Sequence, residues 1–253
     1  MVMSAIGDTV IWHDLECGCY SADLTLWREL CAAETGAAEA GAVLDIGAGS
    51  GRVALELARA GHHVTALDRD AALLQALRER AGELPIDTVC ADARTFELLR
   101  HDYAICITPM QTLQLLGGVD GRARFLRSAR AHLVPGGLLA CAIVTDVDAF
   151  DCDDGDAGPS PETVRLEDVT YVSRATRVHI GREVVRIERE RSVLAPGVGS
   201  ARPQLEHDVV ELARVSVAQL QREGREVGLA SAGTRAIPAT EEHTASVAVM
   251  FRA

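Results

Sequence analysis

The sequence predicts a doubly wound α/β fold with a mostly parallel sheet, into which an antiparallel β segment is inserted. Two observations support this prediction. Over the first 145 residues, strand-like segments alternate with amphipathic helices, and the links between them are short. Two long segments of period-two alternation then follow within residues 169–194. Strands that alternate with helices form parallel sheets covered on both faces, whereas period-two alternation is typical of antiparallel strands.

The alternating half is expected to contain five strands and three helices. Apolar and β-branched residues predict the strands, and apolar residues at helical spacing predict the helices. The strands are expected at 43–46, 63–67, 87–91, 103–107 and 138–144. The helices are expected at 52–60, 71–81 and 122–132, and a Val-Pro-Gly-Gly stretch ends the last of them.

The second half begins with an acidic stretch at 146–162, rich in small and turn-forming residues, which predicts an exposed link with solvated carboxylates. After it, alternation predicts a hairpin of two strands, at 169–180 and 183–194, with an Ile-Gly-Arg-Glu turn between them. A third strand is expected at 205–216. A helix at 217–229 and a buried strand at 246–251 are expected to return to the main sheet.

The composition restricts the function to partners of small size. A chain of 253 residues with 48% hydrophobic content can bury a full core. A formal net charge of -12 and an aromatic content of 4% argue against a nucleic-acid surface. We find no run of about 18 apolar residues and no signal-peptide pattern, so we expect a cytoplasmic protein without a membrane span.

Two residue types exclude further chemistry. The sequence contains no lysine, which excludes Schiff-base catalysis, pyridoxal phosphate anchoring and a Walker lysine. Its seven cysteines form no Cys-x-x-Cys pair, and we expect them to be reduced. His13, Cys17, Cys19 and Cys31 are candidate zinc ligands by residue type, but their spacing fits no common zinc pattern.

Three glycines at every second position, Gly47, Gly49 and Gly51, follow the first strand and precede a helix. The dinucleotide-binding motif is Gly-x-Gly-x-x-Gly, and Arg52 occupies the position of its last glycine. S-adenosylmethionine needs close backbone approach, an acidic group for its amino end and a carboxylate for its ribose. Asp45 and Asp68 stand where these carboxylates are required, although Asp68 would also suit the ribose of NAD.

The motifs together resemble those of the class I S-adenosylmethionine-dependent methyltransferases of small-molecule type. Residues 44–52 are similar to that family's glycine motif, 66–70 to its ribose-binding motif, 90–93 to its adenine-binding turn and 133–139 to its approach to the fifth strand. The resemblance covers most of the chain and implies a Rossmann-like seven-stranded sheet, methyltransferase activity and S-adenosylmethionine as cofactor. It implies these cofactor-binding residues: Tyr20, Trp27, Asp45, Gly47, Ala48, Gly49, Gly51, Asp68, Arg69, Asp92, Ala93, Thr108 and Met110. Asp92 could instead cap a turn.

The resemblance also implies how the chain is divided. Residues 1–40 would form a helical lid, 41–145 the cofactor-binding core, 146–215 a linker and β insert over the acceptor, and 216–253 the end of the main sheet. The stretch 13–30 is similar to the family's lid helix, with Tyr20 and Trp27 at its aromatic positions and His13 in place of a tyrosine. Both aromatics could instead pack the N-terminal helix against the core.

The Thr-Pro-Met-Gln stretch at 108–111 departs from the pattern of enzymes that methylate nucleic acid or protein glutamine. With the acidic charge, this favours a small metabolite methylated at N, O or C. Methyl transfer is an in-line displacement, in which a base helps only a protonated acceptor. The catalytic candidates are His13, Gln111 and His243, and Gln114 is expected to orient the acceptor or to face solvent. Binding of the cofactor without methyl transfer, and a homodimer, stay open.

Overall fold

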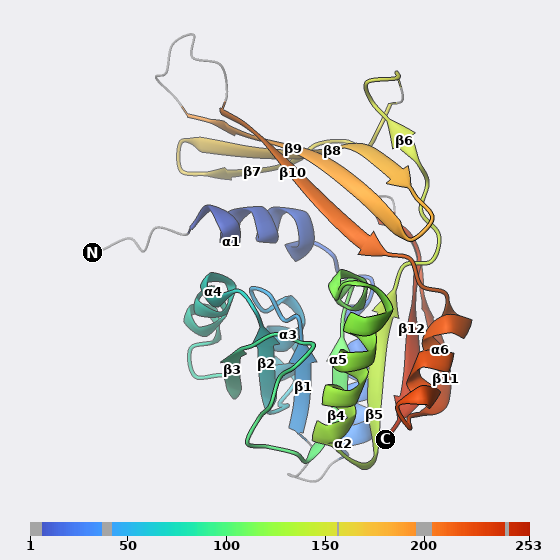
Figure 1. Cartoon of the computed structure of the whole chain (residues 1–253). Helices are drawn as coiled ribbons and strands as arrows, with labels where there is room; N and C mark the ends of the chain where they lie inside the picture. The colour runs from blue at the N-terminus through green and yellow to red at the C-terminus, as the bar shows by residue number, and fades with distance from the viewer. Residues whose placement is uncertain (1–6, 37–41, 156, 196–203, 241–242) are drawn as a thin grey trace.

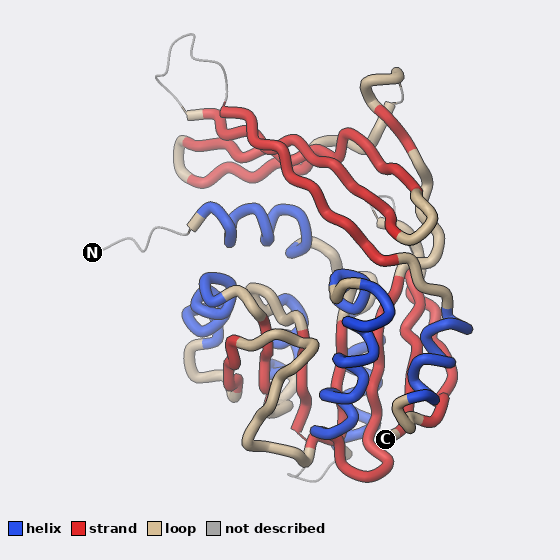
Figure 2. The backbone as a smooth tube through the Cα atoms, viewed as in Figure 1, coloured by secondary structure: helices blue, strands red, loops and turns tan. Residues whose placement is uncertain are grey.

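The structure is a computed structural model that describes residues 7–36, 42–155, 157–195, 204–240 and 243–253. A seven-stranded sheet with helices on both faces forms the main body, and a five-stranded antiparallel sheet lies across its upper end (Figures 1 and 2). Helix α1 (Asp8–His13) lies between the two (Figure 1). No helix in the described ranges is long and apolar enough to span a membrane.

The main sheet has the strand order β11-β12-β5-β4-β1-β2-β3. β1 to β5 pair in parallel, whereas β12 is antiparallel to both of its neighbours. The seven-stranded, mostly parallel sheet predicted from the sequence is therefore confirmed. Its strands are β1 (Ala42–Ile46), β2 (Val64–Asp68), β3 (Ile86–Cys90), β4 (Tyr103–Thr108), β5 (Leu133–Ile143), β11 (Ala230–Ile237) and β12 (Ser246–Arg252).

Two apolar cores lie on opposite faces of this sheet, because successive side chains of a strand point to opposite sides. Val43 of β1 belongs to one core and its neighbour Leu44 to the other. The first core is covered by α2 (Leu24–Thr35), α3 (Arg52–Arg59) and α4 (Ala71–Ala81). The second is covered by α5 (Gly118–His132) and α6 (Val217–Glu226).

The insert between β5 and α6 forms the second sheet, with the strand order β10-β9-β8-β6 and β7 paired to β8. Buried Val178, Val185 and Leu212 lie on the face toward the main body. The strands are β6 (Phe150–Asp151), β7 (Glu162–Leu166), β8 (Val169–Ile180), β9 (Val184–Leu194) and β10 (Gln204–Ala213).

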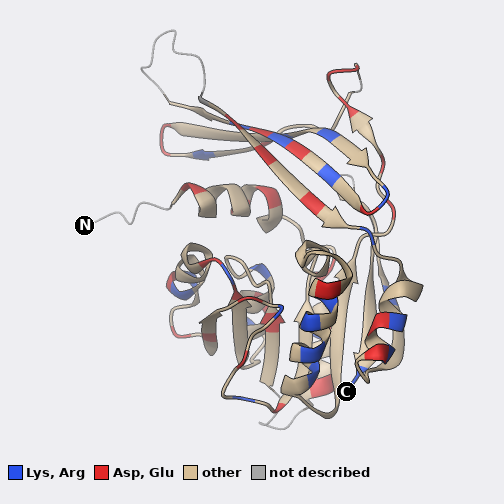
Figure 3. Cartoon of the chain, viewed as in Figure 1, with Lys and Arg blue, Asp and Glu red and all other residues tan. Residues whose placement is uncertain are grey.

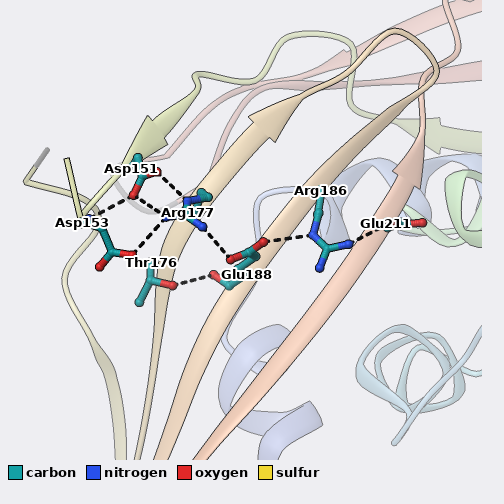
Figure 4. Close-up of polar contacts among 7 residues, drawn as sticks. All are labelled: Asp151, Asp153, Thr176, Arg177, Arg186, Glu188 and Glu211. Carbon is teal, nitrogen blue, oxygen red and sulfur yellow. Dashed lines mark hydrogen bonds and ion pairs between the residues drawn. The ribbon is translucent and has the colours of Figure 1, made fainter.

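Charged residues of both signs alternate along and across the strands of the insert (Figure 3). Arg177 pairs with Asp151, Asp153 and Glu188, and Glu188 also pairs with Arg186 (Figure 4). Each exposed pair contributes little to stability, but the network connects β6 with β8 and β9. The acidic stretch at 146–162, expected to be a solvated link, therefore holds β6, and three of its carboxylates are paired, because Glu162 also pairs with Arg189.

Strand β7 is a further element that the sequence did not predict. Two other differences lie at element ends: α5 begins at Gly118 instead of residue 122, and β5 begins at Leu133, before the Pro-Gly-Gly stretch. Gly136 has a φ of +78°, so the strand bends there without ending. Gly117, the residue before α5, has a left-handed conformation.

Candidate cofactor and acceptor site

The glycine loop connects the carboxyl end of β1 with α3. The N–H groups of Gly47 and Ala48 donate to the Leu67 carbonyl, at 2.8 and 3.0 Å, and so attach the loop to β2. Gly51 has a φ of +100°, and a Cβ there would lie 2.2 Å from Leu77 Cδ1. The third glycine therefore allows α3 and α4 to pack closely, a different role from the cofactor contact predicted for it.

Gly47 and Gly49 lie beneath the side chains of Thr112 and His13. Their φ angles are +77° and +56°, in the region that favours glycine. An added Cβ at Gly47 would lie 2.4 Å from Thr112 Cγ2, and one at Gly49 would lie 2.4 Å from His13 Nε2. Thr112 opens the short helix η2 (Thr112–Leu115), and sequence reasoning had assigned it no role.

Asp45 is a buried carboxyl near the end of β1. It is fully buried, and neither of its oxygens has a hydrogen-bond partner of normal geometry within the described ranges. Burial raises its pKa to about 7, neighbouring Asp68 and Asp23 add to the shift, and Arg52 and the Ala54 backbone N–H oppose it. Buried polar groups are nearly always hydrogen-bonded, so this carboxyl suits a positively charged group that is bound beside the loop.

Asp68 ends β2 and is half-buried. Its Oδ2 accepts from the Gly49 N–H at 2.8 Å, and its Oδ1 accepts from the Asp70 N–H at 2.9 Å. Each oxygen of a carboxylate has two acceptor positions, so one position per oxygen stays free for a hydroxyl donor. The geometry fits the predicted ribose contact, and it also shows Asp68 stabilising the loop itself.

Arg52 joins the loop to the N-terminal segment. Its Nη1 and Nη2 donate to the two oxygens of Asp23, at 2.6 and 2.8 Å, and Trp27 Nε1 donates to the same carboxylate at 2.8 Å. Tyr20 packs between the Arg52 guanidinium and the ring of His243, whose centroid is 4.7 Å from its own. Trp27 is fully buried, a position that favours packing over cofactor contact.

Neither Arg52 nor Asp23 was expected to take part in the site. The only signal in the sequence was the arginine that replaces the last glycine of a dinucleotide motif. The partner Asp23 lies 29 residues away, so its role depends on tertiary structure.

The N-terminal segment, predicted to be a lid and called the lid below, contacts the loop through His13 and Asp14. His13 Nδ1 lies 3.2 Å from Ser50 Oγ, and Ser50 Oγ donates to Asp14 Oδ1 at 2.6 Å. Arg80 of α4 also pairs with Asp14. Burial alone would raise the Asp14 pKa, but hydrogen bonds from His13, Arg80 and Ser50 hold it well below its usual range. The catalytic candidate His13 is thus held against the glycine loop, whereas His243 lies in the Arg52 cluster.

The predicted adenine-binding turn is built by Asp92. Its Oδ1 accepts from the Arg94 N–H at 2.9 Å, and its side chain pairs with the Arg94 guanidinium, which lowers its pKa to about 2. This geometry favours the turn-capping alternative for Asp92. Ala93 beside it is half-buried and Arg69 is exposed, and their predicted cofactor contacts stay predictions.

The segment after β4 holds the junction between the main body and the insert. Thr108 is fully buried, Met110 has a φ of +53°, and Gln111 is half-buried before η2. Gln114 Nε2 donates to the carbonyls of Val144 and Ala213, at 3.1 and 3.2 Å, and its Oε1 accepts from the Val144 N–H at 2.8 Å.

Both alternatives that the sequence left for Gln114 are therefore wrong. It neither faces solvent nor is free to orient an acceptor, because its amide satisfies the backbone where the insert leaves and re-enters the main body.

The insert packs directly on the lid. Arg191 Nε and Nη2 donate to Glu16 at 2.7 and 2.8 Å, and Ser173 Oγ donates to Glu16 at 2.8 Å. The rings of Trp12 and Tyr171 meet edge to face at 5.4 Å. Burial would raise the Glu16 pKa, but the bonds from Arg191 and Ser173 lower it. In the part of the chain that the structure describes, no group of three or more His, Cys, Asp or Glu residues could hold a metal ion.

The fold, the glycine loop and the two carboxylates at strand ends define the class I methyltransferase architecture. Residues 43–137 match the family model of the methyltransferase domain. No curated protein sequence matches the chain significantly.

Solved structures similar to the chain support the same fold. The CcbJ methyltransferase from Streptomyces caelestis superposes with a TM-score of 0.70 at 22% identity, over 98% of this chain and 97% of that one. The sugar N-methyltransferase KedS8 from Streptoalloteichus gives 0.72 at 16%, over 98% and 95%. CalS10 from Micromonospora echinaspora, an amino pentose methyltransferase solved with S-adenosylmethionine bound, gives 0.67 at 21%, over 94% and 96%.

Proposed function

We propose that the protein is an S-adenosylmethionine-dependent methyltransferase that methylates an amine nitrogen of a small molecule. The observation that carries this proposal is Asp45, a fully buried carboxyl to which no described residue is hydrogen-bonded, beside a glycine loop that a Cβ at Gly47 or Gly49 would obstruct. A site of this kind needs a ligand that brings a positive charge and allows close backbone contact.

The chain's residues fit the proposed cofactor. Asp45 would bind its ammonium group, directly or through water, and the free acceptor positions of Asp68 would bind its ribose hydroxyls. When bound, S-adenosylmethionine supplies a methyl group activated by a positive sulfur. The protein's own task is to hold the acceptor in line with that group and to exclude water. The insert and the lid, which pack together through Glu16 and Arg191, are suited to exclude water from this site.

An amine must lose a proton before or during its methylation. His13 is the base that we propose, because its ring lies against Gly49 and its Nδ1 is within 3.2 Å of Ser50 Oγ. Nitrogen as the methylated atom is supported by similar structures whose names specify N-methylation, of a sugar in KedS8 and of a glycopeptide in MtfA.

Two measurements test the proposal. Calorimetry should detect tight binding of S-adenosylhomocysteine and no comparable binding of NAD, and the reverse result would contradict the cofactor assignment. Cell extracts incubated with the protein and with S-adenosylmethionine that carries a labelled methyl group should yield a labelled amine. Cofactor binding together with no labelled product in any extract would favour the alternative function, in which the protein binds the cofactor without transferring its methyl group.

A further inference from the structure

A cavity of about 360 Å³ lies where the insert joins the main body. Val144 and Thr145, just beyond the carboxyl end of β5, form one wall, and Val185 and Leu212 of the insert form another. In open α/β sheets, ligands bind in crevices outside the carboxyl ends of the strands. The cavity is therefore at the end of the sheet where an acceptor is expected, and its volume lies in the range of small-molecule sites.

The charges of this cavity differ from those of the whole chain. The chain has a formal net charge of -12, but Arg182 and Arg214 line the cavity against one carboxylate, Asp146. Arg177, Arg186, Arg189 and Arg191 of the insert each pair with a carboxylate. Within the described ranges, Arg182 and Arg214 form no such pair, although Arg214 Nη1 donates to the Gly181 carbonyl at 2.8 Å. Two unpaired guanidinium groups at one cavity are suited to bind an anion.

Helix η2 relates this cavity to the cofactor loop. Thr112 at its start lies against Gly47, and Gln114, two residues later, lines the cavity. Because η2 is a 3₁₀-helix, which rises about 2 Å per residue, the residue next to the loop and the residue that lines the cavity lie within a single turn. One extended molecule that passes over η2 would reach both.

We propose that this cavity binds the end of the acceptor that is remote from the methylated nitrogen, and that this end carries an anionic group, a carboxylate or a phosphate, held by Arg182 and Arg214. The proposal rests on the proposed function for the identity of the ligand as an acceptor. The apolar side chains of Val147, Ile180 and Val215 in the same lining would contact the part next to the anion.

The test measures binding of small probes by ligand-observed NMR, with S-adenosylhomocysteine at saturation so that the cofactor site is closed to them. Phenyl phosphate and benzoate represent the two anions, and benzyl alcohol is the uncharged control. We expect at least one anion to bind about tenfold more tightly than benzyl alcohol, since a charge-assisted hydrogen bond contributes about 1.5 kcal/mol or more and 1.4 kcal/mol corresponds to a factor of ten.

Variants locate the site. Arg182→Gln and Arg214→Gln should each weaken anion binding several-fold, whereas Asp146→Asn should strengthen it because a like charge is removed. Arg165→Gln is the matched control, since it makes the same change of charge on the insert at a residue outside the cavity. Equal affinity of anions and benzyl alcohol, or equal effects of Arg182→Gln and Arg165→Gln, would overturn the proposal.

These outcomes are separate from those of the proposed function, because anion binding is measured without turnover. If S-adenosylhomocysteine does not bind but the anions still depend on Arg182 and Asp146, the methyltransferase proposal fails and the anion site stands. If the cofactor binds and neither anion does, only the cavity proposal fails.

Discussion

At the residue scale, two aspartates at neighbouring strand ends have different properties because their surroundings differ. Asp68 accepts two backbone hydrogen bonds, whereas Asp45 accepts none within the described ranges and is fully buried. Sequence motifs place both carboxylates at the loop, but they do not show this difference. The pKa of Asp45, raised to about 7, makes it the group through which pH acts on the site.

We predict that S-adenosylhomocysteine binds more tightly as pH rises toward 7 and that its affinity then levels off. Below pH 7 the free protein holds Asp45 neutral, and binding of the cofactor's ammonium group requires its ionisation, so affinity should fall by up to about tenfold per pH unit. Asp45→Asn should bind more weakly at pH 8 and lose this pH dependence. Calorimetry from pH 5.5 to 8 tests this, and an unchanged pH profile in the variant would contradict it.

The same carboxyl should affect stability with a defined sign. Because its folded pKa lies above the unfolded value of about 3.8, the folded protein binds the extra proton, and stability from this group declines as pH rises from about 4 to 7. Asp45→Asn should remove that decline. The free energy of unfolding of the variant, relative to the parent, should therefore increase toward pH 7, as urea titrations at several pH values would show.

Gly49 gives a second prediction at this scale. Gly49→Ala imposes a positive φ on alanine and places Cβ against His13, so we expect S-adenosylhomocysteine affinity to fall at least tenfold. Gly61→Ala is the control for conformational strain, because Gly61 has a φ of +95° and nothing within 4 Å of an added Cβ. The double variant His13→Ala/Gly49→Ala should recover part of the binding. If it recovers none, steric contact with His13 is not the cause.

At the element scale, local patterns predict the strands and helices of the main sheet well, because each carries its own periodicity. Helix α4 (Ala71–Ala81) agrees with its predicted range, and β8 agrees with the predicted first strand of the insert. Strand β6 was missed because it has only two residues, and one of them, Asp151, is held by a pair with Arg177 of the distant strand β8. Gln114 was misassigned for a similar reason, since its partners lie 30 and 99 residues away.

We predict that Gln114→Leu lowers the free energy of unfolding by about 2–4 kcal/mol, since it leaves buried backbone groups of Val144 and Ala213 without partners at about 1–3 kcal/mol each. Gln111→Leu, a matched change three residues earlier at a half-buried position, should cost less than 1 kcal/mol. Urea denaturation measures both. Hydrogen exchange should also increase at residues 144–146 and 213–215 in the Gln114 variant alone, and equal destabilisation by the two variants would contradict this role.

At the scale of the whole molecule, the N-terminal segment lies between the main body and the insert and contacts both. Asp14 pairs with Arg80 of the main body, and Glu16, two residues later, pairs with Arg191 of the insert. The lid is thus held on two sides through one turn of the chain. The sequence of this segment is similar to the family's lid helix, which predicted a lid. The arginines that hold it lie 66 residues from Asp14 and 175 residues from Glu16, so a local pattern could not predict them.

We predict that loss of the Glu16–Arg191 pair loosens the lid without unfolding the main body. Arg191→Met leaves the half-buried Glu16 carboxylate without its charged partner, and Glu16→Gln leaves Arg191 paired only with Asp208 among the described residues. The double variant removes both charges and should be less damaging than Arg191→Met. In the single variants, hydrogen exchange at residues 8–18 should rise, and S-adenosylhomocysteine should dissociate faster.

The contribution of Glu16 should also depend on pH. Because the Glu16 pKa is lowered in the folded protein, its contribution is present above the unfolded value of about 4.5 and is lost as pH falls through the folded pKa. Lid protection in the parent should therefore decline below about pH 4.5. The pKa of Asp14 is also lowered, so its contribution to lid protection is lost in the same direction as pH falls. The double variant should therefore keep only the part of the decline that is due to Asp14. An identical dependence of lid protection on acid pH in the parent and the double variant would show that Glu16 does not hold the lid.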